Sequence, residues 1–408
     1  MEQFDCVVIG GGMVGAASAL SLAELGLKVA LVEKETQKTT SDIELIRQPF
    51  DLRVSAISLA SEHLLTQLGV WQQIKNWRVC PYKRLAVWEK TSAYTEFHAQ
   101  NINQNHLGHI VENKLIQLAL WQRIKSKTNV HFFCPQTLVS LEQSEGYAQV
   151  RLTHCTIQTK LVIGADGAQS KVRQMAGIGI TGWDYPQSAM LINVKTALPQ
   201  QDITWQQYLP TGPVAFLPLP SCGEGETEEP SGNASLVWYH HRDEIKRLSL
   251  LSNSQLQQEV LKYFPKRLGG IEVISKAAFP LTRRHANNYQ NKQVLLLGDA
   301  AHTINPMAGQ GVNLGFKDVK ALQEVIASAI GNGECWHQEH ILARYEKMRR
   351  TDNLLMMSTM DVLYTGFSHP SSVVKTGRNL VLMAINKVPF INSTLKNRAL
   401  AYACGVSV

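Results

Sequence analysis

The sequence of 408 residues lacks the features that mark several specialised classes of protein. It contains no run of about 18 or more apolar residues, so we expect no membrane-spanning helix. It has no Lys/Arg-rich tract, and its formal net charge of +7 arises from 40 basic and 33 acidic residues, which argues against a nucleic-acid-binding protein. Acidic Glu2 and Asp5 stand where a secretory or transit peptide would be basic. We therefore expect a cytoplasmic protein with no nucleic-acid partner.

Closely spaced cysteines are also absent. The seven cysteines are scattered, and no pair has the Cys-x-x-Cys spacing of a metal or redox site. This pattern favours reduced thiols over a disulfide framework, and we predict no metal site. The composition is otherwise ordinary for a globular protein with a large core, since 44% of the residues are hydrophobic and 18% are charged. The length suits an enzyme of two domains.

A glycine-rich segment near the N-terminus has the context of a dinucleotide site. The pattern predicts a buried strand at residues 4–9, a helix at 16–25 that ends at Gly26, and a second strand at 28–32. Residues 10–15 match G-x-G-x-x-G, and Glu33 follows the second strand. In such a unit the glycines allow a tight turn, a close approach of the pyrophosphate and close helix–strand packing, while the acidic residue accepts hydrogen bonds from a ribose. The predicted dinucleotide contacts are Gly10, Gly12, Val14, Gly15 and Glu33.

Two later segments favour FAD over NAD, which the first motif alone does not distinguish. Residues 160–173 predict a strand, an Asp166-Gly167 turn and a basic helix start, and residues 293–297 predict a strand that delivers Gly298 and Asp299. Because FAD is long, its flavin half needs a second strand end, where Asp299 can accept hydrogen bonds from ribityl hydroxyls. A helix that begins near Gly309 would direct its amides at the flavin ring, which is negative when reduced. The alternative is an NAD-only dehydrogenase, which would be colourless.

These three motifs, in this order, resemble the para-hydroxybenzoate-hydroxylase class of FAD monooxygenases. Nearly the whole chain is similar to the ubiquinone-biosynthesis hydroxylases of that class, including residues 51–58, 110–121 and 279–286. Residues 204–207, 235–239 and 360–364 resemble the branch that hydroxylates a demethoxy polyprenyl-benzoquinol. The resemblance implies an α/β fold, in which a Rossmann-like FAD-binding domain carries an inserted sheet-rich substrate domain and a helical C-terminus. We expect the FAD-binding domain at 1–75, 107–178 and 288–345, the substrate domain at 76–106 and 179–287, and the helical segment at 346–408.

The resemblance also implies the chemistry. FAD, reduced by NAD(P)H or another donor, would add dioxygen, and the flavin hydroperoxide would hydroxylate the ring of a polyprenylated benzoquinol without a metal. Alternatives are a sister hydroxylase that acts at another ring position or on another phenol, and a catalytically idle flavoprotein scaffold of the quinone-synthesis complex. Residues 377–408 combine apolar and basic side chains and would either pack on the core or bind a membrane periphery or other ubiquinone-biosynthesis proteins.

Several further residues are predicted near the cofactor by the resemblance. Arg53 would lie near the pyrophosphate and flavin, unless it is an ordinary arginine at a helix start. Asn113 and Gln117 would bind the cofactor or merely cap or face a helix, and Asp166 would place the cofactor or only hold its own turn. No catalytic side chain is assigned, and His302 is expected to be structural. The remaining candidates, all expected on the flavin side, are Gly298, Pro306, Gly309, Gly311 and Asn313. An acidic surface loop is predicted at residues 221–234.

Overall fold

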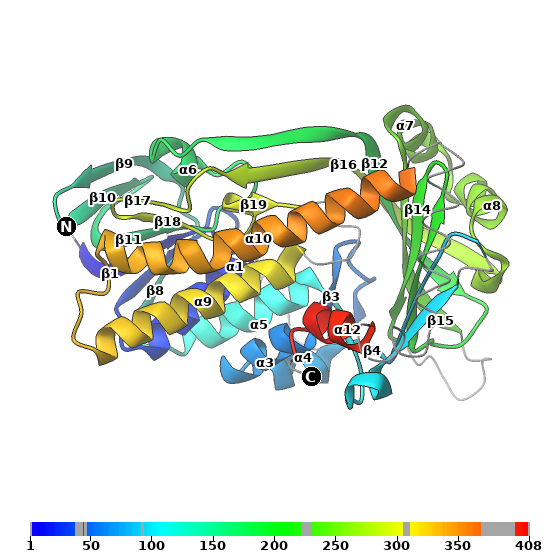
Figure 1. The fold of residues 1–408 in the computed structure, drawn as a ribbon, viewed down its shortest axis with the longest axis horizontal. Coiled ribbons are helices and arrows are strands. Elements are labelled where there is room, and N and C mark those ends of the chain that lie inside the picture. The colour runs from blue at the N-terminus through cyan, green and yellow to red at the C-terminus, as the bar shows by residue number, and fades with distance from the viewer. Residues whose placement is uncertain are drawn as a thin grey trace.

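The computed structural model describes residues 2–36, 44, 47–90, 94–221, 231–304, 311–368 and 396–406. Figure 1 shows two main sheets at opposite ends of the molecule, with long helices between them. Pro306, Gly309, residues 222–230 of the acidic loop and most of the C-terminal tail lie outside the described residues. The predicted α/β class, with a second sheet-rich part and a helical C-terminus, is confirmed.

The first sheet has the strand order β17-β18-β11-β1-β2-β8, with β10 and β9 attached beyond β11. β1 lies between β11 and β2 and pairs in parallel with both. Because helices cover the parallel part of this sheet, its strands β1 and β2 carry buried apolar runs, as the sequence predicts. Its strands are β1 (Glu2–Ile9), β2 (Val29–Val32), β8 (Val130–Phe133), β9 (Leu138–Ser144), β10 (Tyr147–Leu152), β11 (Thr156–Gly164), β17 (Gln290–Asn291) and β18 (Val294–Leu296).

Helices α1 (Met13–Glu24), α5 (Asn113–Lys125) and α9 (Gly311–Gly331) pack on this sheet, with α1 in contact with both of the others. Their buried side chains join those of the strands in the largest hydrophobic core of the described residues. The other helical elements are α3 (Leu59–Gln67), α4 (Trp71–Trp77), η2 (Ala99–Ile102), α6 (Lys171–Met175), α7 (Arg242–Leu250), α8 (Asn253–Tyr263), η3 (Lys266–Leu268), η4 (Gly298–Ala300), α10 (Glu339–Ser368) and α12 (Lys396–Cys404). Among the described helices, none combines the length and apolarity needed to cross a bilayer.

The second sheet has the order β19-β16-β12-β15-β14-β13-β5-β6, and a small third sheet has the order β3-β7-β4. The strands of the second sheet are β5 (Arg84–Trp88), β6 (Thr95–His98), β12 (Ile180–Thr196), β13 (Ile203–Leu209), β14 (Gly212–Leu219), β15 (Gly232–His241), β16 (Ile271–Ala286) and β19 (His302–Thr303). The third sheet consists of β3 (Val54–Ser58), β4 (Cys80–Tyr82) and β7 (Gly108–Glu112). The predicted loop 221–234 is wrong at its C-terminal end, because β15 begins at Gly232 and Asn233 already pairs with Leu219.

One face of the second sheet is covered by helices. Phe216 and Trp238 lie on this face and share a hydrophobic core with Ile245 of α7 and Leu256 of α8. In Figure 1 these two helices lie on the outer side of the sheet, away from the first sheet. The outer face is therefore occupied by core packing.

The opposite face of the second sheet looks toward the first sheet. Ala189 and Val237 belong to a separate apolar cluster on this face. Side chains alternate along a strand, so Asn193 lies on the same face of β12 as Ala189. The Asn193 amide donates hydrogen bonds to the carbonyl oxygens of Phe50 (3.0 Å) and Asp51 (3.2 Å). This contact places the inner face of the second sheet beside the segment that precedes β3.

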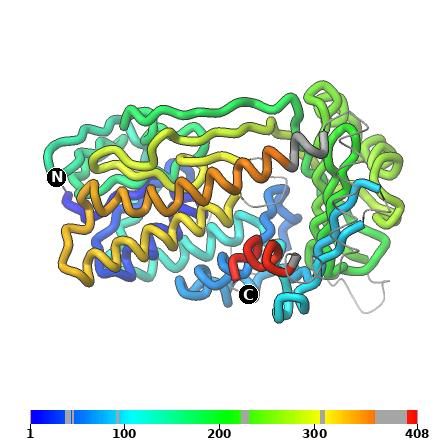
Figure 2. Tube along the Cα trace, in the orientation of Figure 1, coloured from blue at the N-terminus to red at the C-terminus, as the bar shows by residue number. Residues whose placement is uncertain are grey.

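Three long elements connect the two sheets. β12 and β16 pair antiparallel over most of their 17 and 16 residues, and their register shifts between Asp184 and Ser188, where the ribbon can bend. Figure 2 shows both strands and the helix α10 running along the molecule from the first sheet to the second. The two sheets are therefore held together by continuous secondary structure.

Candidate functional site

The turn between β1 and α1 leaves room only for glycine at two positions. Gly10 has a φ of +105°, and a side-chain Cβ there would lie 2.4 Å from the carbonyl oxygen of Ala165. A Cβ on Gly15 would lie 1.9 Å from the Gly10 carbonyl oxygen, so α1 packs directly on the turn. By contrast, a Cβ on Gly12 would meet no atom within 4 Å. Protein therefore fills the space around Gly10 and Gly15, whereas the space beside Gly12 is open.

The start of α1 is suited to an anionic group. Gly12 is the N-cap residue and provides no side chain to cap the helix, and the first turn contains no acidic residue. Uncapped amides and the helix dipole favour a phosphate at such a position. Val14 faces the interior of the protein, since a Cβ on Gly298 or Gly315 would lie 3.3 Å or 2.5 Å from its methyl groups. Val14 therefore positions α1 against α9, and only its backbone amide is available to a phosphate.

Gly11 is fixed at both ends of its peptide unit. Its amide donates to Glu33 Oε2 at 2.7 Å. Its carbonyl oxygen accepts hydrogen bonds from Gln117 Nε2 (2.9 Å) and from the buried indole Nε1 of Trp121 (2.6 Å), both on α5. Gln117, predicted to bind the cofactor or to face a helix, thus holds the turn that would bind it. Sequence reasoning did not identify Trp121 as a site residue.

Glu33 ends β2 and has a second set of partners. Its Oε1 accepts hydrogen bonds from the amides of Lys34 (2.8 Å) and Glu35 (2.9 Å). These bonds and the Gly11 contact fix the carboxylate, but a carboxylate offers about four acceptor sites. Acceptor capacity therefore remains on the carboxylate, and its contact with a ribose hydroxyl stays a prediction.

Arg53 lies directly before strand β3, so the interpretation as a helix-start arginine is wrong. Its backbone carbonyl accepts the amide of Asn113 at 3.0 Å, and its backbone amide donates to Asp51 Oδ1 at 2.8 Å. The residue is exposed, and its guanidinium has no hydrogen-bond partner within the described part of the chain. Asn113 Oδ1 accepts a hydrogen bond from Ser55 at 2.6 Å, which joins the start of α5 to β3.

Gly298 and Asp299 follow strand β18, as predicted. Gly298 has a φ of +55°, and Asp299 is exposed to solvent on one side. Protein atoms crowd its other sides, and this desolvation raises the pKa of Asp299, while the positive charges of His302 and Arg53 oppose the rise. A carboxylate that is partly open to solvent can accept a hydrogen bond from a hydroxyl group. The electrostatic effect of Arg53 also links the β3 segment to the second glycine motif.

Asp166 holds its own turn. Its Oδ2 accepts hydrogen bonds from the amides of Lys171 (2.7 Å) and Val172 (3.2 Å) at the start of α6. The structural interpretation therefore accounts for one carboxylate oxygen. The other, Oδ1, is buried and has no hydrogen-bond partner among the described residues. The predicted role of Asp166 in placing the cofactor stays a prediction.

Gly311 and Asn313 lie at the start of α9. A Cβ on Gly311 would meet no described atom within 4 Å. The Asn313 side chain is buried, accepts hydrogen bonds from the Ser58 amide (3.0 Å) and Ser61 Oγ (2.7 Å), and donates to the Ala56 carbonyl (2.8 Å). Asn313 thus joins α9 to β3 and α3, and Pro306 and Gly309 lie outside the described residues.

A buried polar network lies directly behind Gly298. Asp318 Oδ2 accepts the Gly298 amide (3.0 Å) and contacts His302 Nε2 (2.5 Å), while its Oδ1 accepts Arg349 Nε (2.7 Å) and Asn353 Nδ2 (3.3 Å). Burial alone would raise the pKa of Asp318, but its contacts with His302 and Arg349 lower that pKa strongly, so the carboxylate is ionised. His302 is therefore a structural partner of Asp318, in agreement with the sequence analysis. The two residues are 16 positions apart in the sequence, so motif reasoning did not identify them as a pair.

The inner face of the second sheet is apolar and aromatic. Tyr208 and Tyr239 are buried there, and burial raises the pKa of both phenols, so both are neutral. Leu191, Leu217 and Phe279 surround them and are only partly buried. This face lies beside the segment that leads to Arg53, so it offers an apolar surface next to the two glycine motifs.

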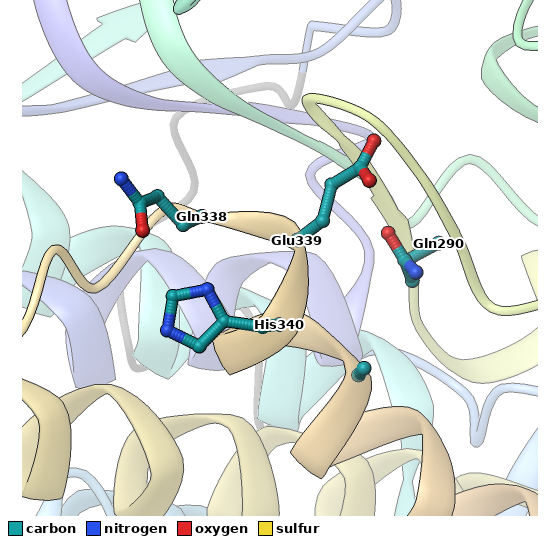
Figure 3. Close-up of a pocket in the computed structure, with 5 residues that line it drawn as sticks. Gln290, Gln338, Glu339 and His340 are labelled. Carbon is teal, nitrogen blue, oxygen red and sulfur yellow. The ribbon is translucent and has the colours of Figure 1, made fainter.

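One surface depression is unrelated to these motifs. Figure 3 shows it between β17 and the start of α10, lined by Gln290, Gln338, Glu339 and His340 together with Ala343. The depression is open to solvent, and it includes none of the residues predicted to bind the cofactor.

Comparisons with known proteins agree with the geometry of this site. The chain matches the FAD binding domain family over residues 3–356. It is 44% identical over 407 residues to the 3-demethoxyubiquinol 3-hydroxylase of Escherichia coli, with 99% of each chain covered. It is 33% identical to the mitochondrial ubiquinone biosynthesis monooxygenase COQ6 of Danio rerio over an alignment that covers 98% of this chain and 90% of that protein. The crystal structure of p-nitrophenol 4-monooxygenase from Pseudomonas putida covers 100% of both chains with a TM-score of 0.77, and its 19% identity makes this a likeness of fold alone.

Proposed function

This chain belongs to the FAD binding domain family, and we propose that it hydroxylates the aromatic ring of a polyprenylated benzoquinol in ubiquinone biosynthesis. It is an FAD-dependent monooxygenase. One observation carries the choice of substrate: the similarity to the E. coli hydroxylase extends over 99% of both chains, so it includes the sheet that would face the substrate as well as the cofactor motifs. A likeness limited to the cofactor motifs would have identified only a flavoprotein.

We propose that the described residues of the two glycine motifs form one site for FAD. We propose that the pyrophosphate lies beside Gly12 at the uncapped start of α1, where a Cβ would meet no atom within 4 Å. Glu33 would accept a ribose hydroxyl and Asp299 the ribityl hydroxyls. Arg53, whose guanidinium has no hydrogen-bond partner in the described chain, would supply positive charge on the flavin side. The division of the chain into two domains at the predicted boundaries is part of the same proposal.

FAD, when bound and reduced, supplies the activation of dioxygen, and NAD(P)H is proposed as the electron donor. The protein's part is to position the ring and to exclude water. We propose that Leu191, Leu217 and Phe279 on the inner face of the second sheet hold the ring, since they are partly open and apolar. The neutral phenols of Tyr208 and Tyr239 behind them add no charge that would attract water.

Complementation tests the proposed substrate. An E. coli strain that lacks its 3-demethoxyubiquinol 3-hydroxylase would express this chain, and its quinones would be identified by mass spectrometry. We expect the demethoxy intermediate to disappear and ubiquinone to return, whereas an Asp299→Ala variant should restore little. A sister hydroxylase or an idle scaffold would leave the intermediate in place, although the purified protein would still be yellow with FAD.

Membrane or partner contacts are proposed only for the C-terminal tail. Within its described part, α12 buries Leu400, Ala401 and Cys404 against the η2 segment, which matches the core-packing interpretation there. The basic residues Arg378 and Lys387 lie outside the described residues. Replacing both with Glu should reduce sedimentation with anionic lipid vesicles, and unchanged sedimentation would contradict the proposed contact.

A further inference from the structure

A second cluster of titratable side chains lies away from the glycine motifs. Glu62 on α3, His106 in the turn before β7 and His109 in β7 come together although 44 or more residues separate the carboxylate from the imidazoles. Glu62 Oε2 lies 2.8 Å from His106 Nε2 and 3.2 Å from His109 Nδ1. The potential ligand atoms of all three lie within 4.8 Å of one another. Each residue therefore presents one lone-pair donor to the same small volume.

The surroundings hold these groups in place. The His109 ring packs edge-on against Trp71 (centroids 5.0 Å apart) and against His106 (4.4 Å). His109 is 6% exposed, and its buried Nδ1 faces the Glu62 carboxylate at 3.2 Å without the alignment of a hydrogen bond. A cation held by both groups would satisfy the buried nitrogen better than this contact does.

The charge state of the cluster suits a cation. Burial would raise the pKa of Glu62, but its contacts with His106 and His109 lower that pKa to about 2. The carboxylate is therefore ionised at neutral pH. Two imidazole nitrogens and one carboxylate oxygen form a donor set that binds Zn²⁺, with a water molecule completing the tetrahedron.

The distances are close to those of a bound ion. Zn–N and Zn–O bonds of about 2.0–2.2 Å place tetrahedral ligand atoms about 3.4 Å apart. The observed separations of 2.8 and 3.2 Å need only a small outward movement. The His106 side chain is 24% exposed and lies in a turn, so it can make this movement and opens a path for the ion.

We propose that Glu62, His106 and His109 bind one divalent transition-metal ion, with Zn²⁺ the favoured species, and that this ion joins α3 to β7. The site takes no part in the proposed hydroxylation. The ion would stabilise the fold, because the backbone amide of Ser58, the N-cap of α3, donates to the Asn313 side chain at the start of α9. An occupied site would fix the helix that anchors that segment.

Zinc titration of the intact flavoprotein tests the proposal. Tag-free holoenzyme is treated with EDTA and dialysed, and ZnCl₂ is added in competition with a chromophoric chelator. The ligand variants are Glu62→Gln and His106→Gln. The matched control is His63→Gln, which removes an exposed histidine of the same helix next to Glu62. The flavin absorbance of each variant verifies that it is folded.

We expect one zinc ion per chain in the wild type and in the control. Each ligand variant should bind it at least about 10- to 100-fold more weakly, the loss expected for removal of even an outer partner of a metal site. Zinc at 100 times its Kd should shift the folding equilibrium of wild type and control about 100-fold, and should not shift that of the ligand variants. Equal zinc affinity in all four proteins would overturn the proposal. So would an X-ray absorption spectrum that shows sulfur ligands, or a wild type that binds no zinc, which would leave only an ion pair.

Discussion

Adding one methyl group at each of three different glycines should separate two roles of the β1–α1 turn. One is the proposed binding of the pyrophosphate, and the other is the close packing of α1 on the turn. Gly12→Ala places its Cβ in open space, where we propose the pyrophosphate lies. Gly15→Ala places its Cβ 1.9 Å from the Gly10 carbonyl oxygen. Gly331→Ala is the control, because a Cβ at this end of α9 also meets nothing within 4 Å and lies outside the turn.

The magnitudes follow from these distances. Gly12→Ala should cost the apoprotein no more than about 1 kcal/mol, the value of a poorer N-cap. It should weaken FAD binding about 5- to 150-fold, because forcing a methyl group into an occupied space costs about 1–3 kcal/mol. Gly15→Ala needs α1 to move about 1.5 Å to reach ordinary contact, and the blocking atom is backbone. We expect it to lower both apoprotein stability, by more than about 3 kcal/mol, and FAD affinity.

The assay measures thermal unfolding of the apoproteins and FAD affinity from the quenching of flavin fluorescence on binding. Gly331→Ala should resemble the wild type in both. Wild-type FAD affinity in Gly12→Ala would refute the proposed position of the pyrophosphate. Wild-type apoprotein stability in Gly15→Ala would refute the close packing of α1 on the turn.

Three further outcomes are expected. Trp121→Phe removes the 2.6 Å hydrogen bond to the Gly11 carbonyl, so FAD affinity measured by titration should fall about 2- to 12-fold; an unchanged affinity would show that the indole does not position the turn. Burial and nearby positive charges lower the pKa of His285 from 6.5 to about 4, so its contribution to stability is present above pH 6.5 and is lost as the pH falls toward 4. Chemical denaturation should therefore show that the free energy of unfolding falls by up to about 3 kcal/mol between pH 6.5 and pH 4. His285→Gln should reduce this dependence on pH, and an equally steep dependence in the variant would contradict the prediction. Asp361→Asn breaks the 2.7 Å ion pair between α10 and Arg283. We expect a higher KM for the quinol and more hydrogen peroxide released per NAD(P)H oxidised, at unchanged FAD affinity. An unchanged yield of hydrogen peroxide would contradict this expectation.

The fold around the glycine motifs was predictable because its signals are local. The strand, turn and helix at residues 2–24 follow one another, and the spacing of the glycines is typical of a tight turn between a strand and a closely packed helix. The strand before Gly298 is predictable for the same reason. The division into domains and the cofactor contacts themselves stay predictions.

The residues that support the site were not predictable, because they act across long stretches of sequence. Trp121 lies 110 residues from Gly11, and nothing in its own helix marks it as a donor to a turn. Asn313 reaches Ser58 across 255 residues. For Arg53, local reasoning left a helix start open as the alternative to a cofactor contact, whereas pairing of β3 with β7 places the residue directly before a strand. Such contacts follow from tertiary packing, on which a single sequence carries no direct signal.

The strand order of the first sheet has a consequence for how the protein is made. The neighbours β11 and β18 pair in parallel, but about 130 residues separate Gly164 from Val294 along the chain. At translation speeds of about 5–20 residues per second, this edge of β11 stays unpaired for roughly 6 to 26 seconds before β18 is synthesised. An unpaired apolar edge is prone to wrong pairing during that interval. β10 covers residues 156–159 of that edge and leaves residues 162–164 unpaired until β18 emerges, so an FAD site that uses Asp299 can be complete only late in synthesis.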